Sequence, residues 1–119
     1  MDARQLGIYG ELVAARYLKK KGYRILETNF HSRFGEIDII AQIGQTIVFI
    51  EVKTRDSGTM TRPMEAVTPA KQRKIKSTAL LYLSGNEREV DARFDVIEVL
   101  AVTSGDKKVR VHHIADAFI

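Results

Sequence analysis

The sequence predicts an α/β fold in which a mixed sheet carries one helix on each face. Two segments place apolar residues at the three- and four-residue spacing of a helix, and five others have the apolar runs or the alternation of strands. These segments follow one another in the order α-β-β-β-α-β-β. The chain of 119 residues has no internal repeat, low-complexity tract or linker, so we expect a single domain over residues 1–119.

The first helix is expected to end before Gly22, because glycine readily adopts the left-handed conformation that stops a helix. Three lysines at positions 19–21 precede this glycine and complement the negative end of the helix dipole. The residues of its apolar face recur at helical spacing: Leu6, Tyr9, Gly10, Val13, Tyr17 and Leu18.

Three strands are expected next, at Tyr23–Phe30, Glu36–Ile43 and Thr46–Thr54. Only Gly44 and Gln45 separate the second strand from the third, which predicts a tight hairpin turn. The second and third strands should therefore be antiparallel neighbours in the sheet. This pairing matters for function, since both strands carry charged residues.

The second helix is predicted to begin after Thr68, whose side chain can cap it, with Pro69 at its first position. Gly85 should end the helix. Ahead of the helix, we expect Asp56–Pro63 to form a mobile loop that can close over a substrate. The inward face of the helix is expected to hold Gln72, Ile75, Ala79 and Leu83.

The last two strands are expected to differ in burial. Ala92–Val102 is largely apolar, which favours a strand covered on both faces. A turn at Ser104–Asp106 leads to Lys108–Ile114, whose alternating pattern is typical of an edge strand. Adjacent strand residues point to opposite faces, so His112 and His113 cannot share a metal and are interpreted as surface residues.

The composition favours a polyanionic partner, because the formal net charge is +4 and the sequence pI is about 9.5. The chain has no cysteine, which excludes disulfides and thiolate metal sites. No apolar run approaches the ~20 residues needed to span a bilayer, so we expect no membrane association. The N-terminus lacks the apolar core of a signal peptide, which makes the cytoplasm the expected compartment.

Charged residues interrupt the apolar runs of the predicted hairpin. Asp38 lies within Ile37–Ala41, and Glu51 and Lys53 interrupt the next run. Glu51 and Lys53 share a strand face, and one register of the hairpin sets Asp38 close to Glu51. A divalent cation such as Mg²⁺ would relieve the repulsion between the two carboxylates, and Lys53 could then orient or deprotonate a water for phosphodiester hydrolysis. A structural ion pair explains the same residues equally well.

Asp38, followed after twelve residues by Glu51-Val52-Lys53, resembles the PD-(D/E)xK pattern of restriction endonucleases and archaeal Holliday-junction resolvases. The resemblance implies a restriction endonuclease-like αβββαβ core, here with an extra C-terminal edge strand. Ile37 stands where a proline commonly precedes the aspartate, a loose feature of the pattern. More closely, the chain resembles the YraN family of uncharacterised bacterial proteins in five blocks: "GIYGELVAARYLKKKGYRILETNF", "RFGEIDIIA", "VFIEVKTR", "AVTPAKQRKI" and "RFDVIEV".

This resemblance implies a role for each residue that matches the motif. Asp38 and Glu51 would be ligands of Mg²⁺ or Mn²⁺, with the Val52 carbonyl as a further ligand. Lys53 would be the catalytic lysine. Glu11 on the first helix matches the position at which resolvase-like members contribute another metal-binding glutamate; the alternative is a solvated helix residue.

Further candidates surround the predicted metal site. Gln72 can reach the active site from the second helix, as helix glutamines do in several nuclease subfamilies, or it can cap or pack locally. Basic residues near the N-terminus of that helix and beside the hairpin form an expected phosphate track, since a helix N-terminus already favours anions; a solvated face is the alternative. These residues are Lys71, Arg73, Lys74, Arg33 and Arg55.

Two ion pairs are expected to be structural, Glu36 with Arg33 and Arg93 with Asp95; the alternative for Glu36 is a further metal ligand. The functional expectation is a metal-dependent nuclease whose partner is nucleic acid, DNA rather than RNA, with branched or damaged DNA implied by the resolvase resemblance. The alternative is a non-catalytic nucleic-acid-binding or protein-interaction module that retains the fold. A homodimer is also expected, because resolvase-like nucleases commonly cut two strands as dimers.

Overall fold

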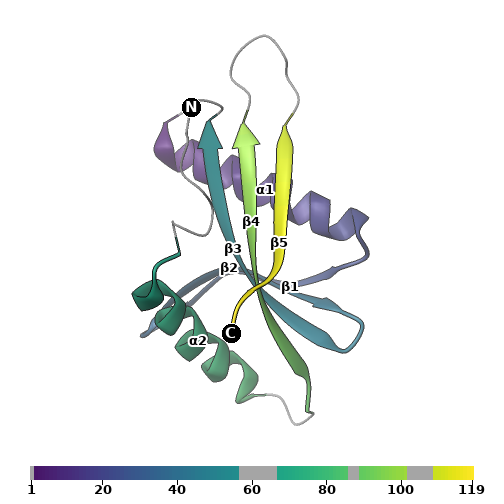
Figure 1. Cartoon of the computed structure of the whole chain (residues 1–119), viewed down its shortest axis with the longest axis vertical. Helices are drawn as coiled ribbons and strands as arrows, with labels where there is room; N and C mark the ends of the chain where they lie inside the picture. Colours follow the sequence, from purple (N-terminus) through teal and green to yellow (C-terminus); the bar gives the residue numbers. More distant parts are fainter. Residues whose placement is uncertain (1, 57–66, 86–88, 102–108) are drawn as a thin grey trace.

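The computed structural model describes residues 2–56, 67–85, 89–101 and 109–119. Helix α1 (Ala3–Lys20) covers one face of a five-stranded sheet, and α2 (Pro69–Leu83) covers the other (Figure 1). The α/β class and the element order predicted from the sequence are confirmed. The strands are β1 (Arg24–Ser32), β2 (Gly35–Ile43), β3 (Thr46–Asp56), β4 (Asp91–Ala101) and β5 (Arg110–Phe118).

The sheet is mixed and its spatial order is β1-β2-β3-β4-β5. Strands β3 and β4 are parallel, and the other three pairs are antiparallel. The chain passes through α2 between β3 and β4. This connection returns the chain to the end of the sheet at which β3 begins, so β4 runs parallel to β3. Strand β5 is an edge strand as expected, but it continues beyond Ile114 to Phe118.

Alternation along the central strand divides the core into two clusters. Val48 and Ile50 of β3 pack with Leu18 of α1, whereas Phe49 packs with Ile75 of α2. Each helix therefore contacts only one face of the sheet. No helix within the described ranges is long and apolar enough to cross a membrane.

Local sequence signals fix the ends of both helices. Gly22 has the positive φ of 92° expected of a helix stop. Thr68 caps α2 by accepting a hydrogen bond from the Lys71 backbone N–H at 3.2 Å, and Pro69 is the first helical residue. These predictions are confirmed. The expected loop at Asp56–Pro63 lies almost wholly outside the described residues, as does the expected turn at 104–106; only Asp56 is described, and it ends β3.

A close approach between α1 and β3 depends on Gly10, which is buried against Thr54. A Cβ atom at position 10 would overlap the Thr54 hydroxyl and lie 2.8 Å from the Thr54 Cβ. Only a residue without a side chain allows α1 to sit this near to β3. Glu11, the next residue, is thereby held beside the β2–β3 hairpin.

His113 is not the surface residue predicted from the sequence. Its register partner is Ile97 of β4, which faces the core under α1, so His113 turns inward while His112 is exposed. His113 Nε2 lies 2.6 Å from Asp95 Oδ2, and His113 Nδ1 lies 3.1 Å from the Tyr17 hydroxyl. The sequence pattern placed the two histidines on opposite faces correctly, but it did not show that α1 covers one of those faces.

The predicted ion pair between Arg93 and Asp95 is confirmed, with Arg93 Nε 2.9 Å from Asp95 Oδ1. Burial alone would raise the pKa of Asp95, but hydrogen bonds from His113, Arg93 and the Asp116 backbone outweigh it and lower the pKa. This carboxylate is fully buried, and it links β4 to β5.

Replacing Gly10 with alanine should destabilise the protein by about 2 kcal/mol, because the added methyl group forces α1 away from Thr54. Gly7→Ala in the same helix is the matched control, since a Cβ at position 7 meets nothing within 4 Å. It should stabilise the protein by about 0.5–1 kcal/mol. Urea unfolding followed by circular dichroism measures both. Equal effects of the two substitutions would contradict the close approach.

Replacing His113 with alanine should lower the free energy of unfolding by about 2 kcal/mol, because a buried carboxylate loses one of its hydrogen-bond partners. His112→Ala, on the exposed face of the same strand, should change it by less than about 0.5 kcal/mol. Thermal unfolding at neutral pH provides the measurement. If both variants unfold like the wild-type protein, the contact between His113 and Asp95 does not contribute to stability.

Candidate functional site

The register of the β2–β3 hairpin brings the two predicted acidic ligands together. The described ladder ends with the pair Ile39 and Ile50, and Asp38 and Glu51 are the next residues along the two strands. The Val52 backbone N–H donates a hydrogen bond of 2.8 Å to Asp38 Oδ2, which holds the carboxylate against β3. This is the register in which the sequence sets Asp38 close to Glu51.

Glu51 is a buried carboxylate with two ammonium groups against it. Its side chain is 8% exposed, and its Oε1 atom lies 2.9 Å from Lys71 Nζ and 3.3 Å from Lys53 Nζ. Lys53 comes from the same strand, whereas Lys71 reaches across from the first turn of α2. Both cations contact the same oxygen atom, so the negative charge of Glu51 is compensated inside the protein.

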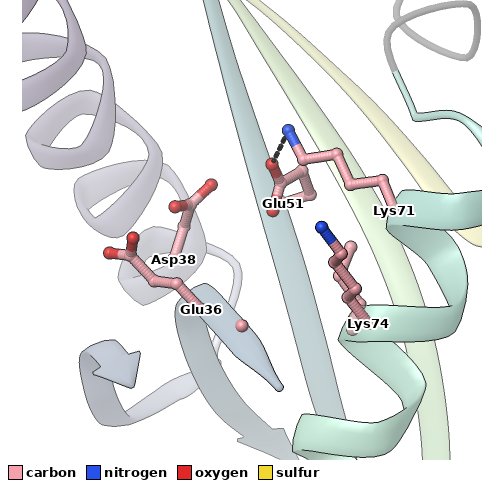
Figure 2. A pocket seen from close by; sticks show the side chains of 7 residues that line it. Glu36, Asp38, Glu51, Lys71 and Lys74 are labelled. Atoms are coloured by element: carbon pink, nitrogen blue, oxygen red, sulfur yellow. Dashed lines mark ion pairs between the residues drawn. The ribbon is translucent and has the colours of Figure 1, made fainter. Parts of the chain in front are cut away.

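The carboxylates open into a pocket of about 260 Å³ between the hairpin and α2. Figure 2 shows Asp38 and Glu36 on one side, Lys71 and Lys74 on the other, and Glu51 between them. Gly35 and Ile75 complete the lining. The pocket thus has an acidic wall from β2 and a basic wall from the N-terminal half of α2.

The ionisation of Asp38 is strongly suppressed. Burial raises the pKa of Asp38 to about 7, and the negative charge of Glu51 adds to this effect. The hydrogen bond from the Val52 N–H lowers the pKa but only partly offsets the rise. Within the described residues, Lys53 and Lys71 form their ion pairs with Glu51, and Asp38 forms none.

The pKa values of the two lysines that contact Glu51 are shifted in opposite directions. Burial lowers the pKa of Lys53, and the neighbouring Lys71 lowers it further. For Lys71, burial acts in the same direction, but hydrogen bonds to Lys53 and Glu51 and the negative charges of the pocket outweigh it and raise the pKa. A lowered pKa at Lys53 suits a residue that accepts a proton from water.

The donor set of this pocket fits a hard divalent cation. Two carboxylates from adjacent strands repel each other, and a Mg²⁺ or Mn²⁺ ion bound by one or two carboxylates and several waters would relieve that repulsion. Within the described ranges, no three Asp, Glu or His side chains form a group that could hold a metal. The site therefore supplies two carboxylates rather than a complete protein cage.

Glu11 lies near this pair of carboxylates. Burial raises the pKa of Glu11, a side-chain hydrogen bond to Asn29 opposes the rise, and Glu36 and Glu51 contribute repulsion. Those interactions place the Glu11 side chain at the α1 edge of the acidic wall. Metal binding by Glu11 and by the Val52 carbonyl stays a prediction.

The basic candidates occupy different environments. Lys71 and Lys74 line the pocket, while Arg73 is exposed on α2. The Gln72 amide donates a hydrogen bond of 3.0 Å to the Val67 carbonyl, so it secures the chain ahead of α2 rather than reaching the carboxylates. Arg33 is exposed, and its guanidinium lies 4.8 Å from the centre of the ring of its neighbour Phe34.

The predicted pair between Glu36 and Arg33 is wrong. Glu36 Oε1 lies 3.7 Å from His31 Nε2, since His31 and Glu36 are register partners across β1 and β2. Arg33 lies in the turn between these strands and its side chain packs over Phe34 instead. Cross-strand pairing, which the sequence alone did not provide for β1, determines the partner.

Glu98 is a buried acid that sequence reasoning missed. It is the register partner of Lys53 in the parallel pair of β3 and β4, and its Oε2 atom lies 3.9 Å from Arg55 Nε. Among the described residues, neither of these two atoms has a hydrogen-bond partner. Arg55, expected to meet phosphate, therefore lies largely buried beside Glu98. The signal was present, because Glu98 interrupts the apolar run of β4 as Asp38 interrupts that of β2.

Comparisons with known proteins agree on one family. The sequence model of the uncharacterised protein family UPF0102 matches residues 10–99. The chain is 47% identical to a UPF0102 protein from Syntrophomonas wolfei over 97% of this chain and 98% of the relative. It is 48% identical to one from Alkaliphilus oremlandii over 97% and 98%, and 50% identical to one from Chlorobium limicola over 98% and 94%.

Replacing Asp38 with asparagine should stabilise the metal-free protein at pH 8 by roughly 2 kcal/mol. The pKa of Asp38 is raised on folding, so the folded protein keeps a proton that the unfolded chain releases between about pH 4 and pH 7. Stability therefore falls as the pH rises through this window, and asparagine removes the loss. Urea unfolding in EDTA at pH 5 and pH 8 measures the difference.

The matched control is Asp91→Asn, a substitution of an exposed residue at the start of β4. This variant should follow the wild-type protein at both pH values, within about 0.5 kcal/mol. The gap between Asp38→Asn and the wild-type protein should be smaller at pH 5 than at pH 8. A gap of the same size at both pH values would show that the Asp38 carboxyl group does not titrate in this window.

Proposed function

The chain belongs to the uncharacterised protein family UPF0102, the YraN family whose sequence blocks it resembles, and we propose that it is a metal-dependent nuclease that hydrolyses phosphodiester bonds. One observation carries the proposal. Two carboxylates of neighbouring strands line one pocket with Lys71 and Lys74 of α2, and Lys53 Nζ lies 3.3 Å from Glu51 Oε1. Groups suited to metal binding, proton transfer and phosphate binding therefore lie close together at this site.

Each charged residue in or beside the pocket would have its own role in the hydrolysis. Asp38 and Glu51 would hold Mg²⁺ or Mn²⁺, which supplies Lewis-acid stabilisation and lowers the pKa of bound water. Lys53, whose pKa burial lowers, accepts a proton from the attacking water or orients it. Lys71 and Lys74 hold the phosphate, assisted by the positive end of the α2 dipole.

The proposed substrate is DNA, in a branched or damaged form. A net charge of +4 and the basic wall of α2 favour a polyanion. The preference for DNA over RNA, the branched structure and a homodimeric arrangement follow from the resemblance to resolvase-like nucleases. A cytoplasmic location is proposed as well, independently of this resemblance.

A second candidate is a binding module that does not cleave. The contacts of Glu51 favour it, because Lys71 and Lys53 already compensate the charge that a metal would otherwise compensate. Such a module would bind nucleic acid through the basic residues of α2. It would do so equally well with and without a divalent cation, which separates it from the nuclease.

Cleavage of DNA by the purified protein should require Mg²⁺ or Mn²⁺ and should fall by at least about 100-fold in Asp38→Asn and in Lys53→Met. The assay compares linear, nicked and four-way-junction DNA in Mg²⁺, Mn²⁺ or EDTA. Asp91→Asn and Lys19→Met are the matched controls, since both replace exposed residues away from the pocket and should leave the rate unchanged.

The same assay distinguishes the two candidates. Tight DNA binding without cleavage, unaffected by Asp38→Asn, Lys53→Met or EDTA, would establish the binding module and overturn the nuclease. Cleavage that survives Asp38→Asn would show that the carboxylate pair is not the reaction centre. Absence of both binding and cleavage on every DNA would contradict both candidates.

A further inference from the structure

We propose that Lys71 is a displaceable internal counterion of Glu51, which withdraws when a divalent cation binds and then holds the substrate phosphate at the pocket. The inference rests on the proposed metal-dependent function and deepens it. Lys71 would have two alternative partners: the Glu51 carboxylate in the metal-free protein, and the substrate phosphate once the cation has bound. Cation binding and substrate binding are thereby linked through one side chain.

A cation that binds Glu51 at Oε1 competes with the ammonium groups already on that atom. Lys71 Nζ lies 2.9 Å from Glu51 Oε1, the shortest ion pair of the pocket, and Lys53 Nζ lies 3.3 Å from the same oxygen. A Mg²⁺ ion would approach that oxygen to about 2.1 Å. At this separation the like charges of the ion and the ammonium repel strongly, so one ammonium has to move.

Lys71 is the ammonium that is free to move. Its side chain is 40% exposed, against 19% for Lys53, which lies within the central strand. The backbone of Lys71 is fixed by the cap of α2, through the hydrogen bond from its N–H to Thr68. The flexible four-carbon stem of lysine can therefore swing without any change in the helix.

The position that Lys71 swings into is the basic wall of the same pocket. Lys74 lines that wall from the next turn of α2, and the two side chains face Asp38 and Glu36 across the pocket (Figure 2). An ammonium released from Glu51 at the N-terminus of a helix lies where a phosphate is already favoured. Binding of the cation should therefore strengthen binding of the phosphate, and the reverse also follows.

Two effects of opposite sign test the proposal in the full-length chain. Lys71→Met should tighten Mn²⁺ binding about tenfold, because the ion no longer competes with an ammonium for Glu51. The same variant should weaken binding of a phosphorothioate DNA duplex in the presence of Mn²⁺ by about tenfold. Electron paramagnetic resonance of free Mn²⁺ measures the first effect, and fluorescence anisotropy measures the second.

Lys74→Met is the matched control, since it removes the same charge from the same pocket wall. The structure shows no ion pair between Lys74 and Glu51 among the described residues, so Mn²⁺ affinity should rise by no more than about threefold. Asp38→Asn should weaken Mn²⁺ binding, which identifies the ion measured as the one in the pocket. A general loss of structure in Lys71→Met would weaken the binding of both Mn²⁺ and DNA, whereas the proposal expects the two affinities to change in opposite directions.

The outcomes separate this inference from the proposed function. Mn²⁺ that binds the wild-type protein through Asp38, but no more tightly in Lys71→Met than in Lys74→Met, would overturn the displacement and leave the nuclease proposal standing. A crystal structure with Mn²⁺ in the pocket and Lys71 still on Glu51 would do the same. Mn²⁺ binding that is absent, or indifferent to Asp38→Asn, would overturn the inference and the proposed metal-dependent function together.

Discussion

The register between β2 and β3 is the constraint on which the rest of this molecule depends. It places Asp38 beside Glu51, and in doing so it puts two carboxyl groups into a partly buried position where both cannot ionise freely. A shift of one residue would turn every side chain of the hairpin to the opposite face, exposing its core residues. The apolar residues that fix the register therefore also maintain the repulsion between the acids.

The protein resolves this repulsion only in part. Glu51 forms ion pairs with two lysines, whereas Asp38, within the described part of the chain, accepts a backbone hydrogen bond from Val52 and retains a raised pKa. A structural ion pair would compensate both carboxylates, because a buried charge without a partner is costly. The unequal treatment of the two acids is more easily understood if a cation supplies the missing charge when the protein acts.

The buried acids on the two faces of the sheet have different surroundings. Under α1, Asp95 is hydrogen-bonded to Arg93 and His113 in an arrangement that ties β5 to β4 and stabilises its ionised form. Under α2, the acids open into a pocket and face two lysine side chains of that helix. Under α1 the charge of Asp95 is compensated by Arg93, whereas under α2 Asp38 forms no ion pair within the described residues. Stability and the proposed chemistry are thus built on opposite sides of the same strands.

The sequence by itself determined the elements, the hairpin and the acids that it carries, because helical spacing, strand alternation, Gly22 and the Thr68 cap act within a few residues of the chain. Only the tertiary structure decided which charges meet. Lys71 contacts Glu51 from another element, His113 turns under α1 towards Asp95, and Glu98 lies beside Arg55. These partners are distant in sequence, and no local pattern records the packing of helix on sheet that brings them together.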